Sequence, residues 1–503
     1  MIAKNLIHKG SWSTKIFDVG KWYLLGNFLT KGTGILLLPI LTAYLSTYEY
    51  GLLDTIVSFA LFFPFIISLG VDSAFGRLYH DYKEDDTELS KLFSTSFWFI
   101  TLFGGFVITI VLATSKMWSM KILSIDPYPL LFIAFIPLLL TQLGKLGLTL
   151  LQQNLQSKKI TFINFIATVI KLMFVITLLV YFTFGIKAVL VGNAISSFCI
   201  FAFVLFYVLK ENVLKFEMDL SVLKETLRYS IPLLPTFAFV WVNSLVDRLV
   251  IANFDSFEGV GIYSFAFQIG LIIYFFGDSI ARVVSPMSIS GLVADKESVK
   301  IKLSETSLML ISLMSIIALA SLFYAAEIIM ILGNEKYYDA IKLIPIIVLP
   351  SVWGMQYRFF VILIKYSKKT WMLTVSALFS ALVNLILNLV FVPKYGYVAG
   401  AYSTLVSSLV YFGITYFYSK RILNVNFMVL RSVLIVSILI LASVIFILSD
   451  IRVQLDIKFF FLKTILLTCL ILLILKIGKI DVRVVIKNIT QLLNNNFKKL
   501  TLK

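Results

Sequence analysis

The stretch FSTSFWFITLFGGFVITIVLAT at residues 93–114 contains no charged side chain. At a rise of about 1.5 Å per residue, a helix of this length crosses a hydrocarbon core of about 30 Å. Similar apolar stretches recur from Trp22 to Leu475, whereas the alternating segments of about ten residues that form membrane β-barrels are absent. Of the 503 residues, 59% are hydrophobic and 14% are charged. We therefore predict an all-α integral membrane protein.

Polar breaks divide the chain into about fourteen predicted transmembrane helices. The N-terminal segment MIAKNLIHKGSWSTK lacks the short apolar core and small-residue cleavage site of a signal peptide, so we expect the first span to stay in the protein. The predicted spans are residues 22–45, 51–75, 93–114, 128–150, 161–183, 187–209, 229–252, 261–281, 303–325, 343–364, 371–392, 397–418, 428–448 and 459–475.

The basic residues determine the expected orientation, because cytoplasmic loops retain Lys and Arg. With the N-terminus inside, the inside segments hold 30 of the 44 Lys and Arg residues, the outside segments 9 and the spans 5. This count assigns Lys187, Arg431 and Lys463 to adjacent loops, since each can snorkel from a span end. We expect both termini to be cytoplasmic. The net charge of +17 sits beside helix ends, which indicates contact with anionic membrane lipids and not with nucleic acid.

Composition and motifs argue against several kinds of site. Cys199 and Cys469 both fall in predicted spans, and His8 and His80 are the only histidines. A disulfide framework, a Cys/His zinc site and a His-based catalytic triad are therefore not expected. The chain has no GxxxxGK[ST] loop for an ATP motor and no loop beyond roughly 25 residues. We expect no catalytic residue, no metal and no cofactor.

The chain repeats itself at an offset near 205 to 211 residues. DSAFGR at Asp72–Arg77 recurs as DSIAR at Asp278–Arg282, and the lysine pair 158–159 recurs at 368–369. At an offset of 211, Gly185, Ala188, Ser196 and Ser197 match Gly396, Ala399, Ser407 and Ser408. Each match is weak alone, but their order along the chain is the same. The alternative is that these motifs recur only because every inside loop needs basic residues.

The repeat unit holds six spans, and this even number gives both copies the same orientation in the membrane. We therefore predict two parallel six-helix lobes around a central cavity, at residues 1–210 and 211–421. Residues 422–503 lie outside the repeat and are predicted to form two extra transmembrane helices and a basic cytoplasmic tail.

Two segments resemble a known family. Residues 23–54 read YLLGNFLTKGTGILLLPILTAYLSTYEYGLLD, and residues 229–254 read YSIPLLPTFAFVWVNSLVDRLVIANF, followed by GVGIYSFAFQIG at 259–270. They resemble the N-terminal signature and the second-lobe start of bacterial polysaccharide-biosynthesis flippases in the multidrug/oligosaccharidyl-lipid/polysaccharide exporter superfamily. The resemblance covers about the first 420 residues.

The resemblance implies a flippase of the bacterial plasma (inner) membrane. Its implied substrate is an undecaprenyl-pyrophosphate-linked oligosaccharide, for an O-antigen, a capsule or another polymer, carried from the inner to the outer leaflet. We expect alternating access through a cationic cavity. The expected partners are this lipid-linked oligosaccharide and membrane lipids, with a polysaccharide polymerase and chain-length machinery as further possible partners.

Five basic residues fall well within predicted spans: Lys31, Lys145, Lys171, Arg248 and Arg358. Each costs about 2.5 to 3.5 kcal/mol at a helix centre on insertion scales, so it should face a cavity or a partner. We predict that these five residues bind the anionic substrate. The alternatives are structural. Lys31 could pair with a carboxylate such as Asp54, and Lys145 and Arg358 could snorkel to the inner surface.

Two acidic residues are candidates for ion coupling, Asp247 and Asp54, with the ion left open between a proton and sodium. Asp247 is adjacent to Arg248, and consecutive residues point about 100° apart on a helix, so we do not expect a simple pair between them. The alternative for Asp247 is an anchor at the outer interface. Asp72–Arg77 and Asp278–Arg282 lie at inner span ends, where a structural role is expected.

Two other functions stay open. A multidrug exporter of the same superfamily would prefer acidic and aromatic cavity residues, which the basic residues in these spans do not match. A polytopic polysaccharide polymerase or glycosyltransferase would need a sizeable loop with catalytic residues. A membrane scaffold would leave the buried charges unexplained.

Overall fold

The computed structural model describes residues 32–448 and 457–478. Within these ranges the chain is helical and contains no strand, which confirms the predicted all-α membrane class. Among the described residues, thirteen helices are long and apolar enough to cross a membrane, and a shorter apolar helix covers Gly32–Tyr44. The start of the first predicted span and the predicted basic tail lie outside the described residues.

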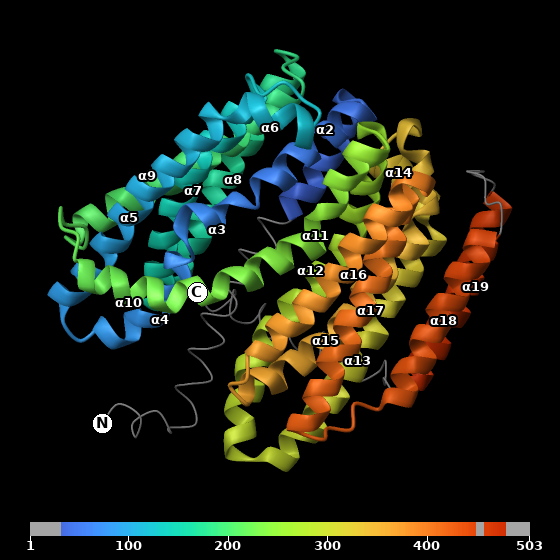
Figure 1. Cartoon of the computed structure of the whole chain (residues 1–503). Coiled ribbons are helices and arrows are strands. Elements are labelled where there is room, and N and C mark those ends of the chain that lie inside the picture. Colours follow the sequence, from blue (N-terminus) through green and yellow to red (C-terminus); the bar gives the residue numbers. More distant parts are fainter. Residues whose placement is uncertain (1–31, 449–456, 479–503) are drawn as a thin grey trace, which may run out of the picture. The chain divides into compact units, whose positions relative to one another are not determined.

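The described chain forms two compact units. Unit 1 comprises the described residues up to Phe265 together with Ile331–Tyr337 and Thr374–Ser407. Within it, α7, α8 and α9 lie side by side, and α2 packs on α11 (Figure 1). Its helices are Thr47–Ala60 (α2), Phe63–Ser68 (α3), Val71–Tyr82 (α4), Asp86–Ala113 (α5), Ser115–Ile122 (α6), Leu130–Gln153 (α7), Ser157–Val180 (α8), Ile186–Lys210 (α9), Leu220–Ser230 (α10), Ile231–Leu233 (η1), Leu234–Phe254 (α11), the start of Phe257–Ala294 (α12), most of Trp371–Tyr395 (α16) and the first part of Tyr397–Ile422 (α17).

Unit 2 comprises Ala266–Met330, Tyr338–Leu373 and the described residues from Ser408 onward. Here α13 packs on α15, α18 and α19. The helices are the rest of α12 and α17, Lys296–Phe323 (α13), most of Ala325–Leu332 (α14), most of Glu335–Lys342 (η2), Ile344–Tyr366 (α15), Val429–Leu448 (α18) and Ile457–Ile477 (α19).

These units follow close packing, whereas the predicted lobes follow the sequence repeat, so the lobe boundaries at 210 and 421 stay a prediction. One pair of repeated residues does share an unusual backbone. Gly185 and Gly396 directly precede α9 and α17, with φ of +54° and +61°. Residues with a side chain rarely adopt this left-handed conformation, so both turns need glycine.

Several helices begin at an aspartate that accepts hydrogen bonds from the first turn. Asp85 caps α5, Asp219 caps α10 and Asp295 caps α13. Such a side chain satisfies backbone N–H groups that have no partner inside the helix. The hydrogen bonds from Thr87 lower the pKa of Asp85, and those from Ser221 and the following backbone lower the pKa of Asp219. The lowered pKa values keep Asp85 and Asp219 charged at neutral pH.

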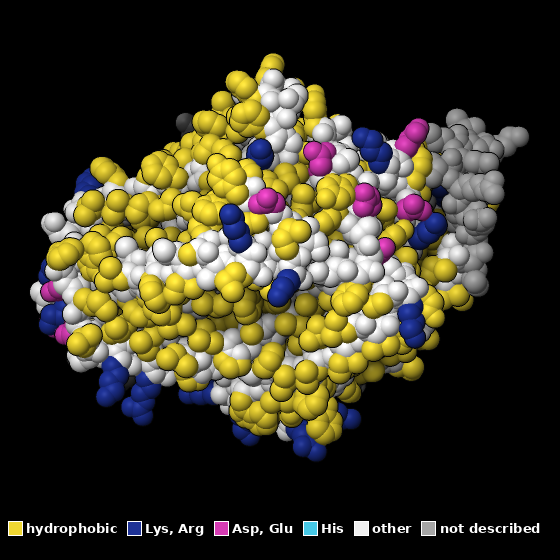
Figure 2. Space-filling view, turned by 45° about the horizontal axis from the view of Figure 1, so that its top comes forward, with side chains coloured by type: hydrophobic (Ala, Val, Ile, Leu, Met, Phe, Trp, Pro, Cys, Tyr) yellow, Lys and Arg dark blue, Asp and Glu magenta, His cyan; other side chains and the backbone are white. Residues whose placement is uncertain are grey.

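Figure 2 shows apolar side chains over much of one face of the molecule. Lys and Arg are few on this face and lie singly among the apolar residues or along its left and lower edges. Leu102 is 64% exposed, Phe206 69% and Leu430 74%. Each lies on a helix long enough to span a membrane. A surface of this kind is unfavourable in water and suits contact with lipid chains.

Two glycines allow α2 and α12 to approach closely. A Cβ atom at Gly51 would lie 1.8 Å from the backbone oxygen of Phe257, and one at Gly261 would lie 2.1 Å from that of Thr47. Contacts this short with backbone cannot be relieved by turning a side chain. Small residues are the usual solution where membrane helices pack tightly.

The first prediction concerns this contact. Gly51→Ala should lower the melting temperature of the purified protein in detergent, because the added methyl group must push the two helices apart, at a cost of about 1 to 3 kcal/mol. Gly105→Ala is the matched control, since its Cβ would meet nothing within 4 Å. Equal melting temperatures for the two variants would contradict the tight contact.

Candidate functional site

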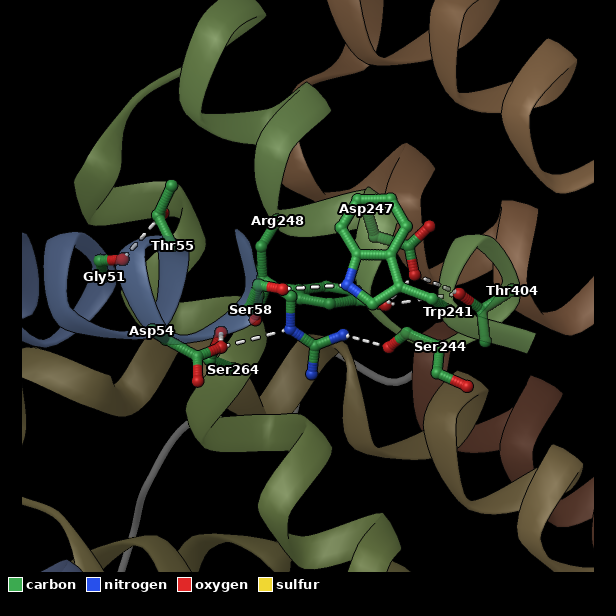
Figure 3. Close-up of polar contacts among 11 residues, drawn as sticks. Gly51, Asp54, Thr55, Ser58, Trp241, Ser244, Asp247, Arg248, Ser264 and Thr404 are labelled. Carbon is green, nitrogen blue, oxygen red and sulfur yellow. Dashed lines mark hydrogen bonds and ion pairs between the residues drawn. The ribbon is translucent and has the colours of Figure 1, made fainter. Parts of the chain in front are cut away.

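Asp54 and Arg248 form a buried ion pair between α2 and α11 (Figure 3). The Arg248 Nε atom donates to Asp54 Oδ2 at 3.0 Å, and Ser264 on α12 donates to the same oxygen at 2.5 Å. Nη1 donates to the Ser244 carbonyl at 2.7 Å. The Arg248 side chain is only 5% exposed and that of Asp54 21%. Three helices of unit 1 therefore meet at one carboxylate.

A second polar link joins the same two helices. The Trp241 indole on α11 donates to the carbonyl of Ser58 on α2 at 2.9 Å (Figure 3). The same indole ring lies 4.9 Å from the Phe62 ring, and Phe65 stacks on Phe237 at 4.5 Å. The ion pair thus sits at one end of a continuous contact of α2 and α3 with α11.

Asp247 is fully buried and is surrounded by neutral donors. Tyr263 and Thr404 donate to Oδ2, each at 2.7 Å, and Asn388 donates to Oδ1 at 2.7 Å. Asp247 and Arg248 share one neighbour, since the Arg248 Cζ atom lies 5.3 Å from the centre of the Tyr263 ring. Their carboxylate and guanidinium groups otherwise bind residues of different helices. Three hydrogen bonds to neutral groups can stabilise a carboxylate without an adjacent salt bridge.

A row of small polar residues on α16 and α17 continues this network. The Asn388 amide also donates to the Asn384 carbonyl at 2.9 Å, and Asn384 donates to Ser407 at 3.3 Å. Asn388 Oδ1 is buried and meets no hydrogen-bond donor among the described residues. The surroundings of Asp247 are therefore rich in oxygen atoms, one of them without a partner there.

Two further charged candidates pair with acids. Lys145 Nζ lies 2.6 Å from Asp72 Oδ2, and Arg358 Nη1 lies 2.5 Å from Asp278 Oδ1. The sequence repeat relates Asp72 to Asp278. The Lys145 side chain is 49% exposed and that of Arg358 only 15%, so the two pairs differ in their access to solvent or lipid.

The remaining two candidates are Lys171 and Lys31. Lys171 lies in the middle of α8, partly buried, and no acidic partner is found for it within the described part of the chain. Lys31 lies outside the described residues. The carboxylate that could have paired with Lys31, Asp54, is bound to Arg248.

A cavity of about 500 Å³ opens elsewhere in unit 1, where α2, α7 and α9 begin. Glu49, Asp126 and Lys187 line it, and none of the predicted site residues does. Over residues 32–448 and 457–478, no three His, Cys, Asp or Glu residues are placed to hold a metal ion.

Sequence reasoning missed the neutral residues of the Asp247 network. Tyr263, Asn388 and Thr404 carry no charge, so the search for charged residues in spans passed over them. A signal was present, because Asn384 and Asn388 are amides one helical turn apart in an apolar span. Polar groups of this kind are also expensive in a membrane and mark a contact or a site.

The second prediction concerns the Asp54–Arg248 pair. In a double-mutant cycle with Asp54→Ala and Arg248→Ala, we expect a coupling energy above about 1 kcal/mol, because either single change leaves the other charge without its partner. The measurement is unfolding of the protein in mixed micelles. The exposed pair Arg77–Asp81 is the control, where about 0.3 to 0.5 kcal/mol is expected. Additive effects at Asp54 and Arg248 would show that the pair is not a stabilising contact.

Comparisons with known proteins show the family through one family model and the fold through solved structures. The family model described as polysaccharide biosynthesis protein matches residues 40–342. A Haemophilus influenzae protein of the Lsg locus is 24% identical over 339 residues, which cover 66% of this chain and 81% of that protein. The family match begins within the short helix Gly32–Tyr44 and ends at Lys342, the last residue of η2.

Two kinds of solved structure share the fold. The lipid II flippase MurJ, in an inward closed conformation, superposes with a TM-score of 0.69 at 19% identity, covering 93% of this chain and 99% of that chain. A multidrug resistance transporter of the MATE family, in the MOP superfamily, superposes in its inward-facing conformation with a TM-score of 0.59 at 10% identity, covering 80% and 93%. At these identities the likeness concerns the fold.

Proposed function

Because the chain belongs to the polysaccharide biosynthesis protein family, we propose that it is a flippase for an undecaprenyl-pyrophosphate-linked oligosaccharide. The substrate moves from the inner to the outer leaflet of the bacterial plasma membrane, and both protein termini are cytoplasmic. The observation that carries the proposal is the set of basic side chains within the membrane-spanning helices, at Lys145, Lys171, Arg248 and Arg358. An anionic head group that leaves water needs compensating positive charge.

Transport in this proposal follows alternating access between the predicted lobes, 1–210 and 211–421. The pyrophosphate and sugar enter a cationic cavity, and the polyprenyl tail remains in lipid. An anion that leaves a negative-inside cell gains about 2.3 kcal/mol per charge per 100 mV, so the membrane potential can drive the step. In this proposal the two additional helices, α18 and α19, lie beside the lipid part of the substrate. A polysaccharide polymerase and its chain-length machinery are the proposed protein partners.

The five substrate candidates have different roles in this mechanism. Arg248 on α11 of the second predicted lobe forms an ion pair with Asp54 on α2 of the first. In the proposed mechanism this ion pair stabilises one of the two conformations of alternating access. Lys171 is partly buried with no acid found beside it in the described chain, and this suits direct contact with the substrate. Lys31, in the first predicted span, is assigned the same direct role.

Ion coupling is assigned to Asp247, with Asp54 as the second candidate. Asp247 is held by three neutral donors, one of which is the amide nitrogen of Asn388. The Oδ1 atom of that amide meets no donor among the described residues. A proton or a sodium ion can bind among these oxygen atoms and neutralise the carboxylate. Either ion would change the hydrogen bonds that join α11, α12, α16 and α17.

The main competing function is multidrug export, which the MATE structure represents. Cationic drugs would be repelled by the basic residues in the spans. An enzymatic role in the same pathway, as a polymerase or a glycosyltransferase, would need a catalytic loop.

The third prediction tests transport. Proteoliposomes that contain the native protein should flip undecaprenyl-pyrophosphate oligosaccharide, and Lys31→Ala and Lys171→Ala should each slow flipping at least tenfold, because a cation beside the head group is lost. Arg77→Ala, an exposed residue of α4, is the control and should flip normally. Native activity with both lysine variants would remove them from the substrate path, and an inactive native protein would favour drug export or enzymatic function.

The fourth prediction tests coupling. Flipping by the native protein should respond to an imposed sodium or pH gradient, and Asp247→Asn should abolish that response because the amide cannot bind either ion by charge. Separate sodium and pH gradients identify the ion. Ser307→Ala, a buried polar residue of α13 in unit 2, controls for loss of packing. A gradient response that survives in Asp247→Asn would transfer the role to Asp54.

A further inference from the structure

Arg248 and Arg358 are both buried arginines, but their guanidinium groups are satisfied differently. Arg248 uses Nε on Asp54 and Nη1 on Ser244. Arg358 uses Nη1 on Asp278, and its Nε and Nη2 atoms are buried without an acceptor among the residues that the structure describes. Buried charged donors without a partner are costly and rare in native proteins. The unpaired atoms of Arg358 therefore point to a ligand.

The two unpaired atoms form one edge of the guanidinium plane. Their N–H bonds run parallel, and this fork matches two oxygen atoms of a phosphate or a carboxylate. Asp278 holds Nη1, on the other side of the group, at 2.5 Å. The direction of the free edge is therefore set before any ligand binds. The side chains of Arg358 and Asp278 are 15% and 9% exposed, so water screens the edge weakly.

Aromatic residues fix the face of the same guanidinium. Its Cζ atom lies 4.5 Å from the centre of the Tyr274 ring, within cation–π distance. Tyr357, next to Arg358 in the chain, contacts Tyr411 with ring centres 5.0 Å apart. The arginine is therefore oriented by a carboxylate at one corner and a ring on its face, and its Nε–Nη2 edge meets no acceptor among the described residues.

The depth of Arg358 suits a lipid head group. It lies eight residues before Tyr366, the last residue of α15, or about 12 Å at the helical rise. This end of α15 carries Lys365 and is predicted to face the cytoplasm. A phosphate attached to a lipid of the inner leaflet can reach that depth without drawing its tail out of the membrane.

We propose that the Nε–Nη2 edge of Arg358 is an oxyanion site that holds two oxygen atoms of the substrate, a step that rests on the proposed flippase function. The oxygen atoms come from a phosphate of the lipid carrier or from the carboxylate of an acidic sugar. Asp278 repels the same anion, which keeps binding weak enough for release, as transport requires. Arg358 thus differs from Arg248, whose donors are used within the protein.

The experiment is binding to the full-length protein in nanodiscs. Arg358→Lys keeps the positive charge but loses the fork. We expect it to bind undecaprenyl pyrophosphate at least tenfold more weakly than the native protein does, and to bind uncharged undecaprenol equally. Arg77→Lys, an exposed arginine paired with Asp81, should change neither. Glucuronate serves as the probe for the carboxylate source.

The proposal is refuted if Arg358→Lys binds both undecaprenyl pyrophosphate and glucuronate as tightly as the native protein does. The parallel N–H donors of Arg358 would then contribute nothing to binding. Weaker binding of only one probe supports the site and identifies the source of the oxygens. If the variant does not fold, a structure of the native protein with undecaprenyl pyrophosphate decides. Oxygen atoms on Nε and Nη2 support the site, and a ligand bound elsewhere refutes it.

Flipping separates this proposal from the proposed function. If the native protein binds the pyrophosphate through Arg358 but does not flip the lipid-linked oligosaccharide, the flippase assignment is refuted and the oxyanion site is supported. A native protein that flips, with an Arg358→Lys variant that binds and flips normally, would leave the flippase and remove the site.

Discussion

A charge inside a membrane must be compensated within the protein, and this constraint organises the polar interior of the chain. Hydrocarbon offers no water to an ion, so each buried charge needs an opposite charge or several oriented dipoles. Asp54 and Arg248 satisfy the requirement with opposite charge. Asp247 satisfies it with three neutral donors. The helices that supply these partners, α2, α11, α12, α16 and α17, are thereby held in a defined arrangement within unit 1.

Two acid–base pairs differ in what their basic residue can do. Asp72 pairs with Lys145, and Asp278, which the predicted repeat relates to Asp72, pairs with Arg358. The Lys145 side chain is half exposed, whereas that of Arg358 is mostly buried. A guanidinium group can bind an acid with one N–H and still offer a pair of parallel N–H donors to a second ligand, whereas an ammonium group acts as a point charge. The choice of base therefore decides whether such a pair can also hold a ligand at a fixed angle.

The fold was largely predictable because the hydrocarbon core of a membrane contains no water to bind backbone N–H and C=O groups. A long apolar segment must be helical, and this rule located most of the transmembrane helices from Thr47 onward to within several residues. The predicted span 51–75 was wrong at its end, because the helix is broken at Leu69 and Gly70, where the backbone is left-handed, before α4 begins. The predicted span 261–281 was too short, since α12 continues to Ala294 through a segment of mixed polarity that hydropathy alone divides. The charged candidates were also visible, because each breaks an apolar run. Their partners were not visible. Asp54 and Arg248 are 194 residues apart in the sequence. Tertiary packing brings them together, and no sequence spacing predicts this contact.

The two ways of compensating charge have different consequences for a transporter. An ion pair such as Asp54–Arg248 is a contact between two helices, so moving the helices apart exposes both charges and requires new partners for them. A carboxylate among neutral donors, such as Asp247, can instead accept a cation in place while its helices stay packed. The first arrangement suits a contact that opens and closes, and the second suits a site that loads and unloads. Asp247 and Arg248 are adjacent residues of α11, so in the proposed mechanism a change of ion at Asp247 would act on the helix that also carries Arg248. Coupling between an ion and the opening of that contact then needs no relay through distant residues, because a small rotation of α11 moves both side chains together.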